Sequence, residues 1–189
     1  VTTNALFYYA KAVAYANLDN HKEAENCAEK FANAYALVPE SRHLFNNKSR
    51  DVLEIANEMM LGEVAFKSGN KTEGLNHLRK AVELDDNLNY EEPWSWPQPT
   101  RHALGALLLE VGNYEEAEVV YKADLGIDEK LPRPSQHPKN VWALRGLHEC
   151  LKLRNDKVEL PHVASLLRQA EARSDIKINA SCLCRSMQS

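Results

Sequence analysis

The segment RHALGALLLEVGNYEEAEVVYKADL, residues 101–125, decides the fold of this chain. Gly105 and Gly112 lie seven residues apart, and Ala117 and Tyr121 follow at intervals of five and four. Small residues at Gly105 and Ala117 let two helices approach closely, and Gly112 readily takes the positive φ that ends a helix. The segment therefore predicts two antiparallel helices joined by a tight turn, with Gly105 facing Ala117.

The same spacing recurs in three other parts of the chain. It is clear around Gly62 and Gly69, weaker between Gly146 and Asn155, and present at the turn Asp19-Asn20. Abundant Ala and Leu, with only seven Gly and eight Pro, also favour an all-α fold. Four helical hairpins are predicted, over residues 3–37, 50–84, 100–125 and 139–172. Their helices are expected at 3–17, 21–37, 50–68, 71–84, 100–111, 114–125, 139–153 and 160–172.

This pattern resembles the tetratricopeptide repeat, a helix-turn-helix unit of about 34 residues. The resemblance is strongest in residues 101–125, good over 57–86 and partial in the two outer units. It implies an all-α, right-handed superhelix of about four units, with an array over 1–173 and a tail over 174–189. The chain also looks similar to a bacterial-type subgroup with an EPP-type Trp-Pro segment and a C-terminal Cys-x-Cys.

Two insertions lengthen the repeat, one over residues 87–100 and one over 126–139, and each contains three prolines. Proline forbids a continuous helix, so both are expected to be loops displayed by the helical scaffold. Trp94 and Trp96 in the first loop either pack over the helices or remain exposed and available to bind a ligand. We predict that at least one of them covers the mouth of the binding groove near His102.

The concave face of such an array is lined by the first helix of each hairpin, and a groove of this kind binds an extended or helical segment of another protein. The repeat spacing places on that face Tyr9, Val13, Asn17, Met59, Glu63, Phe66, Lys67, His102, Leu109 and Glu110. The alternative is that several of these side chains pack against a neighbouring hairpin. A carboxylate clamp for chaperone tails is disfavoured, because it needs Lys, Asn and Arg where the chain has other residues.

The pair Cys182 and Cys184 is the most chemically suggestive feature. Two thiolates one residue apart could bind a soft ion such as copper or zinc, could be oxidised together, or could have no role. A zinc site needs two more ligands, which the tail could meet only by folding back. The available residues are Cys150, His102, His137, His148 and His162.

The tail is expected to lie against the array, because Ile176 and Ile178 would point to one side of an extended segment. In that position they could cap the last hairpin. Cys27 and Cys150 fall inside helical patterns among apolar neighbours, so we expect both to be buried, reduced and inert.

The remaining features argue against several classes of function. A formal charge of −4 disfavours nucleic acid as a partner, and no apolar run is long enough to span a membrane. No phosphate loop or hydrolase motif occurs, and His148, Glu149 and Cys150 cannot form a base and nucleophile pair, because successive residues of a helix point about 100° apart. Glu91 and Glu92, like Glu115 and Glu116, are expected to be solvated charges or acids in the first turn of a helix. We therefore expect a cytoplasmic protein-binding scaffold without an identified catalytic residue, cut from a longer chain.

Overall fold

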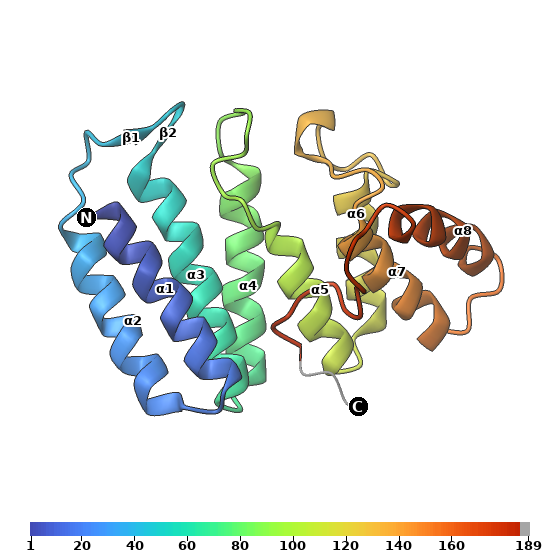
Figure 1. The fold of residues 1–189 in the computed structure, drawn as a ribbon, viewed down its shortest axis with the longest axis horizontal. Coiled ribbons are helices and arrows are strands. Elements are labelled where there is room, and N and C mark those ends of the chain that lie inside the picture. Colours follow the sequence, from blue (N-terminus) through green and yellow to red (C-terminus); the bar gives the residue numbers. More distant parts are fainter. Residues whose placement is uncertain (186–189) are drawn as a thin grey trace. The chain divides into compact units, whose positions relative to one another are not determined.

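The computed structural model describes residues 1–185, which form successive helical hairpins (Figure 1). Within this range the helices are α1 (Thr2–Asn17), α2 (His21–Ala36), α3 (Ser49–Lys67), α4 (Lys71–Asp86), α5 (Thr100–Glu110), α6 (Tyr114–Leu125), α7 (Val141–Leu153) and α8 (Leu160–Glu171). The short elements are β1 (His43–Leu44), β2 (Asn47–Lys48) and the 3-10 helix η1 (Arg133–Ser135). Every α-helix begins and ends within two residues of its predicted range, so the all-α prediction is confirmed.

Two compact units divide the chain at Thr100. Unit 1 (Val1–Thr100) holds the hairpins α1–α2 and α3–α4, and α1 also packs against α3. Unit 2 (Arg101–Ser189) holds nearly all of α5 together with α6, α7, α8 and the tail, and α7 packs against both α6 and α8. None of the helices in the described range combines the length with the apolar character that crossing a bilayer requires.

A residue with positive φ stands in the turn of each hairpin, at the positions that the repeat spacing predicts. These residues are Asp19 (φ 57°), Gly69 (φ 96°), Gly112 (φ 78°) and Asn155 (φ 55°). This conformation favours Gly, Asn and Asp, which is why short polar residues recur in the turns. In the third hairpin the next residue, Asn113, caps α6 by accepting a hydrogen bond from the backbone N–H of Glu116 (3.4 Å).

The helices of the second hairpin approach closely at two glycines, as predicted. A Cβ atom added to Gly62 would lie 2.7 Å from Cγ of Leu78, and one added to Gly74 would lie 2.7 Å from the carbonyl oxygen of Gly62. Both distances are shorter than van der Waals contact, so these positions of α3 and α4 require glycine.

The core of unit 2 is built around one aromatic ring. Tyr121 on α6 has no exposed surface, and a Cβ atom on either Gly105 of α5 or Gly146 of α7 would overlap its ring. The predicted close contact at Gly105 is therefore present, but its tightest partner is Tyr121, one helical turn beyond Ala117.

The hairpin β1–β2 holds the proline-rich loop 87–100, an interaction that the sequence did not predict. The side chain of Asn47 is buried; it accepts a hydrogen bond from the backbone N–H of Asn89 (2.7 Å) and donates to its carbonyl (2.9 Å). Glu91, expected to be solvated, is instead buried and accepts from the backbone N–H of Asn46 (2.9 Å). These bonds fix the loop within unit 1.

Candidate functional site

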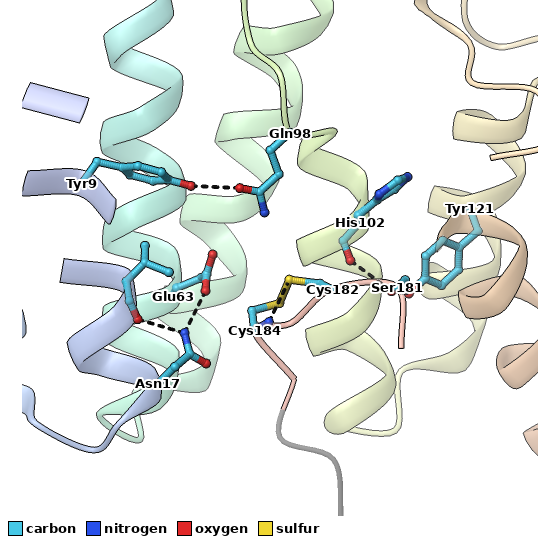
Figure 2. The surroundings of a disulfide bond; sticks show 10 residues. Tyr9, Asn17, Glu63, Gln98, His102, Tyr121, Ser181, Cys182 and Cys184 are labelled. Atoms are coloured by element: carbon cyan, nitrogen blue, oxygen red, sulfur yellow. Dashed lines mark hydrogen bonds between the residues drawn. A yellow bond between two sulfur atoms is a disulfide. The ribbon is translucent and has the colours of Figure 1, made fainter. Parts of the chain in front are cut away.

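Three of the predicted groove residues form a polar cluster on α1 and α3, which we call the α1–α3 face (Figure 2). Asn17 donates hydrogen bonds from Nδ2 to the carbonyl of Val13 (2.9 Å) and to Oε2 of Glu63 (3.2 Å). Tyr9 lies two helical turns before Asn17 on the same helix. The first helices of both hairpins of unit 1 thus contribute to one polar cluster, in which the carboxyl of Glu63 is buried.

Burial changes the acid–base chemistry of this face. Glu63 is 1% exposed, and this burial raises its pKa from 4.5 to about 7, although the hydrogen bond from Asn17 and the charge of Lys67 act in the opposite direction. Near neutral pH the carboxyl is therefore shared between its protonated and ionised forms, so it can both donate and accept hydrogen bonds. The pKa of Tyr9 is raised by burial and by the nearby Glu63, which keeps its hydroxyl protonated.

The loop 87–100 closes over the same helix through one of its two tryptophans. Trp96 is 5% exposed and packs edge to face on Tyr9, with ring centroids 5.4 Å apart, whereas Trp94 is 50% exposed. The hydroxyl of Tyr9 donates to Oε1 of Gln98 (3.2 Å). Nε1 of Trp96 is buried and has no hydrogen-bond acceptor within the described residues. The loop thus packs an apolar ring on Tyr9 and contains a buried N–H that is unpaired within the described residues.

Not all of the predicted groove residues offer a surface to a partner. Met59 and Phe66 of α3 and Leu109 of α5 belong to the hydrophobic core of their units, as the alternative interpretation expected. Val13 and Lys67 are partly exposed and Glu110 is exposed. Periodicity marks the inner side of a first helix, but it does not separate groove positions from core positions.

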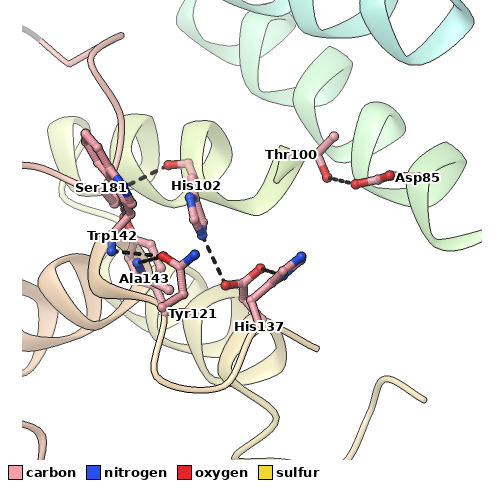
Figure 3. A network of polar contacts seen from close by, with 10 residues as sticks. Asp85, Thr100, His102, Tyr121, His137, Trp142, Ala143 and Ser181 are labelled. Carbon is pink, nitrogen blue, oxygen red and sulfur yellow. Dashed lines mark hydrogen bonds and ion pairs between the residues drawn. The ribbon is translucent and has the colours of Figure 1, made fainter. Parts of the chain in front are cut away.

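Unit 2 contains a buried network centred on Asp124 at the end of α6 (Figure 3). Its Oδ2 accepts from Nε2 of His102 on α5 (3.1 Å), and its Oδ1 accepts from Nδ1 of His137 in the loop 126–139 (2.9 Å). Burial alone would raise the pKa of Asp124, but the two histidines outweigh it and lower the pKa to about 2. The network ties α5 and the second proline-rich loop to α6.

The C-terminal tail lies on unit 2 and makes specific polar contacts there (Figures 2 and 3). The hydroxyl of Ser181 is 2.5 Å from that of Tyr121 and donates to the backbone carbonyl of His102 (3.2 Å). Farther along, Arg185 forms an ion pair with Glu149 of α7 (2.7 Å). The predicted docking of the tail is therefore present in the structure.

One detail of the tail prediction needs correction. Ile178 is 3% exposed, but Ile176 is 61% exposed, so the two isoleucines do not form a joint apolar cap. The buried contacts begin at Ile178 and continue towards Cys184. The segment between α8 and Ile178 is not packed in the way that the alternation suggested.

The proposed metal site is not supported by the structure. Cys182 and Cys184 are joined by a disulfide, so their sulfur atoms are not free to act as thiolate ligands. His102 is engaged by Asp124, and the thiol of Cys150 donates to the carbonyl of Tyr114 (3.0 Å). Among residues 1–185, no group of three or more His, Cys, Asp and Glu side chains could hold copper, zinc or another metal ion.

The other candidate ligands and thiols show ordinary structural environments. Cys27 and Cys150 are free and buried, as predicted, and burial raises the pKa of Cys150 to about 11. His148 is partly buried, and burial together with the charge of Arg145 lowers its pKa. His162 is exposed near the start of α8. None of these groups is brought to the tail cysteines by the contacts described above.

Comparison with known families finds a match to the tetratricopeptide repeat over residues 5–35 and 59–88. These ranges correspond to the hairpin α1–α2 and to the second part of α3 with α4. The match does not include residues 101–125, where the sequence pattern resembled the repeat most strongly. It also does not show whether the chain belongs to the narrower bacterial-type subgroup. No curated protein matches the chain.

Proposed function

The chain is a tetratricopeptide-repeat protein, and on that premise we propose that its α1–α3 face binds an extended segment of a partner protein. Tetratricopeptide repeats generally mediate protein–protein interactions. The partner is a protein and not a nucleic acid, because the acidic balance of the chain would repel a phosphate backbone. We propose the cytoplasm as the place of this interaction.

The buried indole N–H of Trp96, unpaired within the described residues, is the observation that carries the proposal. A buried donor without an acceptor costs about 1–3 kcal/mol, so a ligand that displaces the loop far enough to supply an acceptor gains affinity there. The backbone of an extended peptide presents carbonyl acceptors and N–H donors at regular intervals. The hydroxyl of Tyr9 and the amide of Asn17 offer complementary groups on the same face once a ligand replaces their bonds to Gln98 and Glu63, and the carboxyl of Glu63 lies buried beneath them.

Peptides selected from a random library against the full chain would test this proposal. Asn17→Ala and Glu63→Gln should each weaken the selected peptides about 3- to 10-fold, which corresponds to the loss of one hydrogen bond. Asn4→Ala, at an exposed position of α1, and Glu29→Gln, at an exposed position of α2, serve as matched controls and should leave the affinity unchanged. Selected peptides whose affinity is unchanged by Asn17→Ala and by Glu63→Gln would contradict the proposal.

A second candidate function is thiol–disulfide exchange, and it rests on the disulfide between Cys182 and Cys184. In that reaction a thiolate of a partner dithiol attacks one sulfur, and the other cysteine leaves as a thiolate. The second partner thiol then resolves the mixed disulfide, so the partner is oxidised and both tail cysteines become thiols. Both tail cysteines are buried, so exchange requires the tail to leave unit 2.

Oxidation of a reduced dithiol peptide by the purified chain would test this second function. The wild-type chain should convert the peptide to its disulfide, with two new thiols per chain detected by mass spectrometry. Cys182→Ser with Cys184→Ser should abolish the conversion, and Cys27→Ala should not affect it. A wild-type rate equal to that of the double variant would exclude this function.

A further inference from the structure

We infer that the surface of unit 2 formed by α5, α6 and α7 is a second peptide-binding surface, which the tail of the same chain occupies. The occupant is the tail segment, defined as residues 178–185. The surface beneath it, which we call the tail surface, is identified by the carbonyl of His102, the hydroxyl of Tyr121 and the carboxyl of Glu149. This inference concerns unit 2 alone, so it does not depend on ligand binding at the α1–α3 face.

The tail segment buries every second side chain along most of its length and ends in a turn, in which the backbone N–H of Arg185 donates to the carbonyl of Cys182. Its even-numbered residues face the protein and are buried: Ile178, Ala180, Cys182 and Cys184. Asn179 and Leu183 between them are exposed. Before this turn, a peptide that lies on a surface without helical structure buries alternate side chains, and at the turn the disulfide holds both cysteines on the buried side. Ser181, which is also buried, departs from the alternation because its hydroxyl is held by two polar contacts.

The tail segment is connected to α8 by an irregular linker, residues 172–177. Residues 172–177 contain no helix or strand, and all of them except Ser174 are exposed. The tail segment itself is held by buried side chains, by Ser181 and by the ion pair of Arg185 with Glu149. These contacts are those of a segment lying on a surface built by helices, because residues 178–185 add no helix or strand of their own and bind the carbonyl of His102 and the hydroxyl of Tyr121.

The contacts also define the peptide that the tail surface accepts. The position of Ser181 requires a small hydroxyl residue, because its oxygen lies between the hydroxyl of Tyr121 and the carbonyl of His102. The fourth residue after it carries a positive charge that meets Glu149. A competing partner therefore presents a non-helical segment with small alternate residues, a serine, a turn after it, and an arginine or lysine four positions beyond the serine.

The binding test uses a fluorescent peptide of residues 177–185, KINASCLCR, with its two cysteines joined as a disulfide. It is titrated into the wild-type chain of 189 residues and into the same chain carrying Ser181→Arg, whose own tail cannot dock. A tethered ligand competes at an effective concentration of about 1 mM, so the variant should bind the peptide at least tenfold more tightly than wild type. Adding Glu149→Gln to the variant should weaken binding, whereas adding Glu110→Gln, at an exposed position of α5, should not.

A folded Ser181→Arg chain that does not bind the peptide, or that binds it no better than wild type, would overturn the inference. A second experiment covers the case in which this variant does not fold. A protease site is placed within residues 174–177 of the otherwise wild-type chain, and cleavage leaves every contact of the tail segment in place. Exchange of the severed tail for excess fluorescent peptide, with the helical circular dichroism unchanged, supports the inference. Loss of helix on release of the tail, or failure to exchange, would show that the tail is part of the core.

Discussion

Leu78 and Tyr121 occupy the same place in two successive repeats, and the comparison explains how unit 2 holds the tail. Each lies sixteen residues after a glycine of the preceding helix, Gly62 or Gly105, and each is fully buried against that glycine. Leu78 requires nothing beyond packing. Tyr121 also buries a hydroxyl, which must find a hydrogen-bond partner. Ser181 supplies it, so one residue type in the repeat accounts for a long-range contact.

The largest expected effect comes from disrupting the packing of Gly105 against Tyr121. Gly105→Ala should lower the free energy of unfolding by about 3 kcal/mol, because the added methyl group overlaps an enclosed ring. Urea denaturation followed by circular dichroism measures the change. In the Gly105→Ala background, Tyr121→Leu should cost less than it costs in the wild-type chain, since a leucine can move aside. Strict additivity of the two changes would show that this glycine and ring are not in contact.

The next prediction concerns unit 1 and its buried carboxyl. The folded pKa of Glu63, about 7, lies above its ordinary value of 4.5, so the protonated side chain favours the folded state below pH 4.5 and this contribution is lost as the pH rises through 7. The wild-type free energy of unfolding should fall by about 3 kcal/mol across this range relative to Glu63→Gln. Denaturation at pH 5 and pH 8 measures most of the difference; equal pH dependence in both chains would contradict the raised pKa.

A smaller effect is expected from removing the hydrogen bond between Ser181 and Tyr121. Ser181→Ala should cost about 2 kcal/mol, because it leaves the buried hydroxyl of Tyr121 without its partner. Tyr121→Phe removes that hydroxyl, so the same serine change should then cost much less. A double-mutant cycle from thermal unfolding measures the coupling. A cost of Ser181→Ala that is unchanged in the Tyr121→Phe background would assign the effect to the carbonyl of His102 instead.

The smallest effect compares two equivalent helix caps. Asn20 accepts from the backbone N–H of Glu23, and Asn113 accepts from that of Glu116, both at 3.4 Å. Asn20→Ala and Asn113→Ala should therefore each lower the free energy of unfolding by about 1 kcal/mol. Replacement by Asp in place of Ala should retain most of the stability. A markedly unequal pair of costs would mean that the two turns are not equivalent.

The sequence by itself determined the helical hairpins, because the signals for them are local. Gly69, Gly112, Asp19 and Asn155 mark turns through the backbone conformation that each residue type tolerates, and the structure has positive φ at all four. The interval from a glycine to the residue packed on it depends on helix geometry alone, so Gly62 and Gly74 could be placed at a helix contact from the printed sequence.

The tertiary structure decided which polar groups meet, because those contacts join residues far apart in the chain without any repeating pattern. Tyr9 bonds Gln98 across 89 positions, and Ser181 meets Tyr121 across 60. Asp124 could have been noticed as a charged residue in the last turn of a buried helix, but its partners His102 and His137 could not be paired from spacing. Local conformational preference and helical periodicity specify elements, whereas burial selects the partner of each polar atom only once the elements have packed.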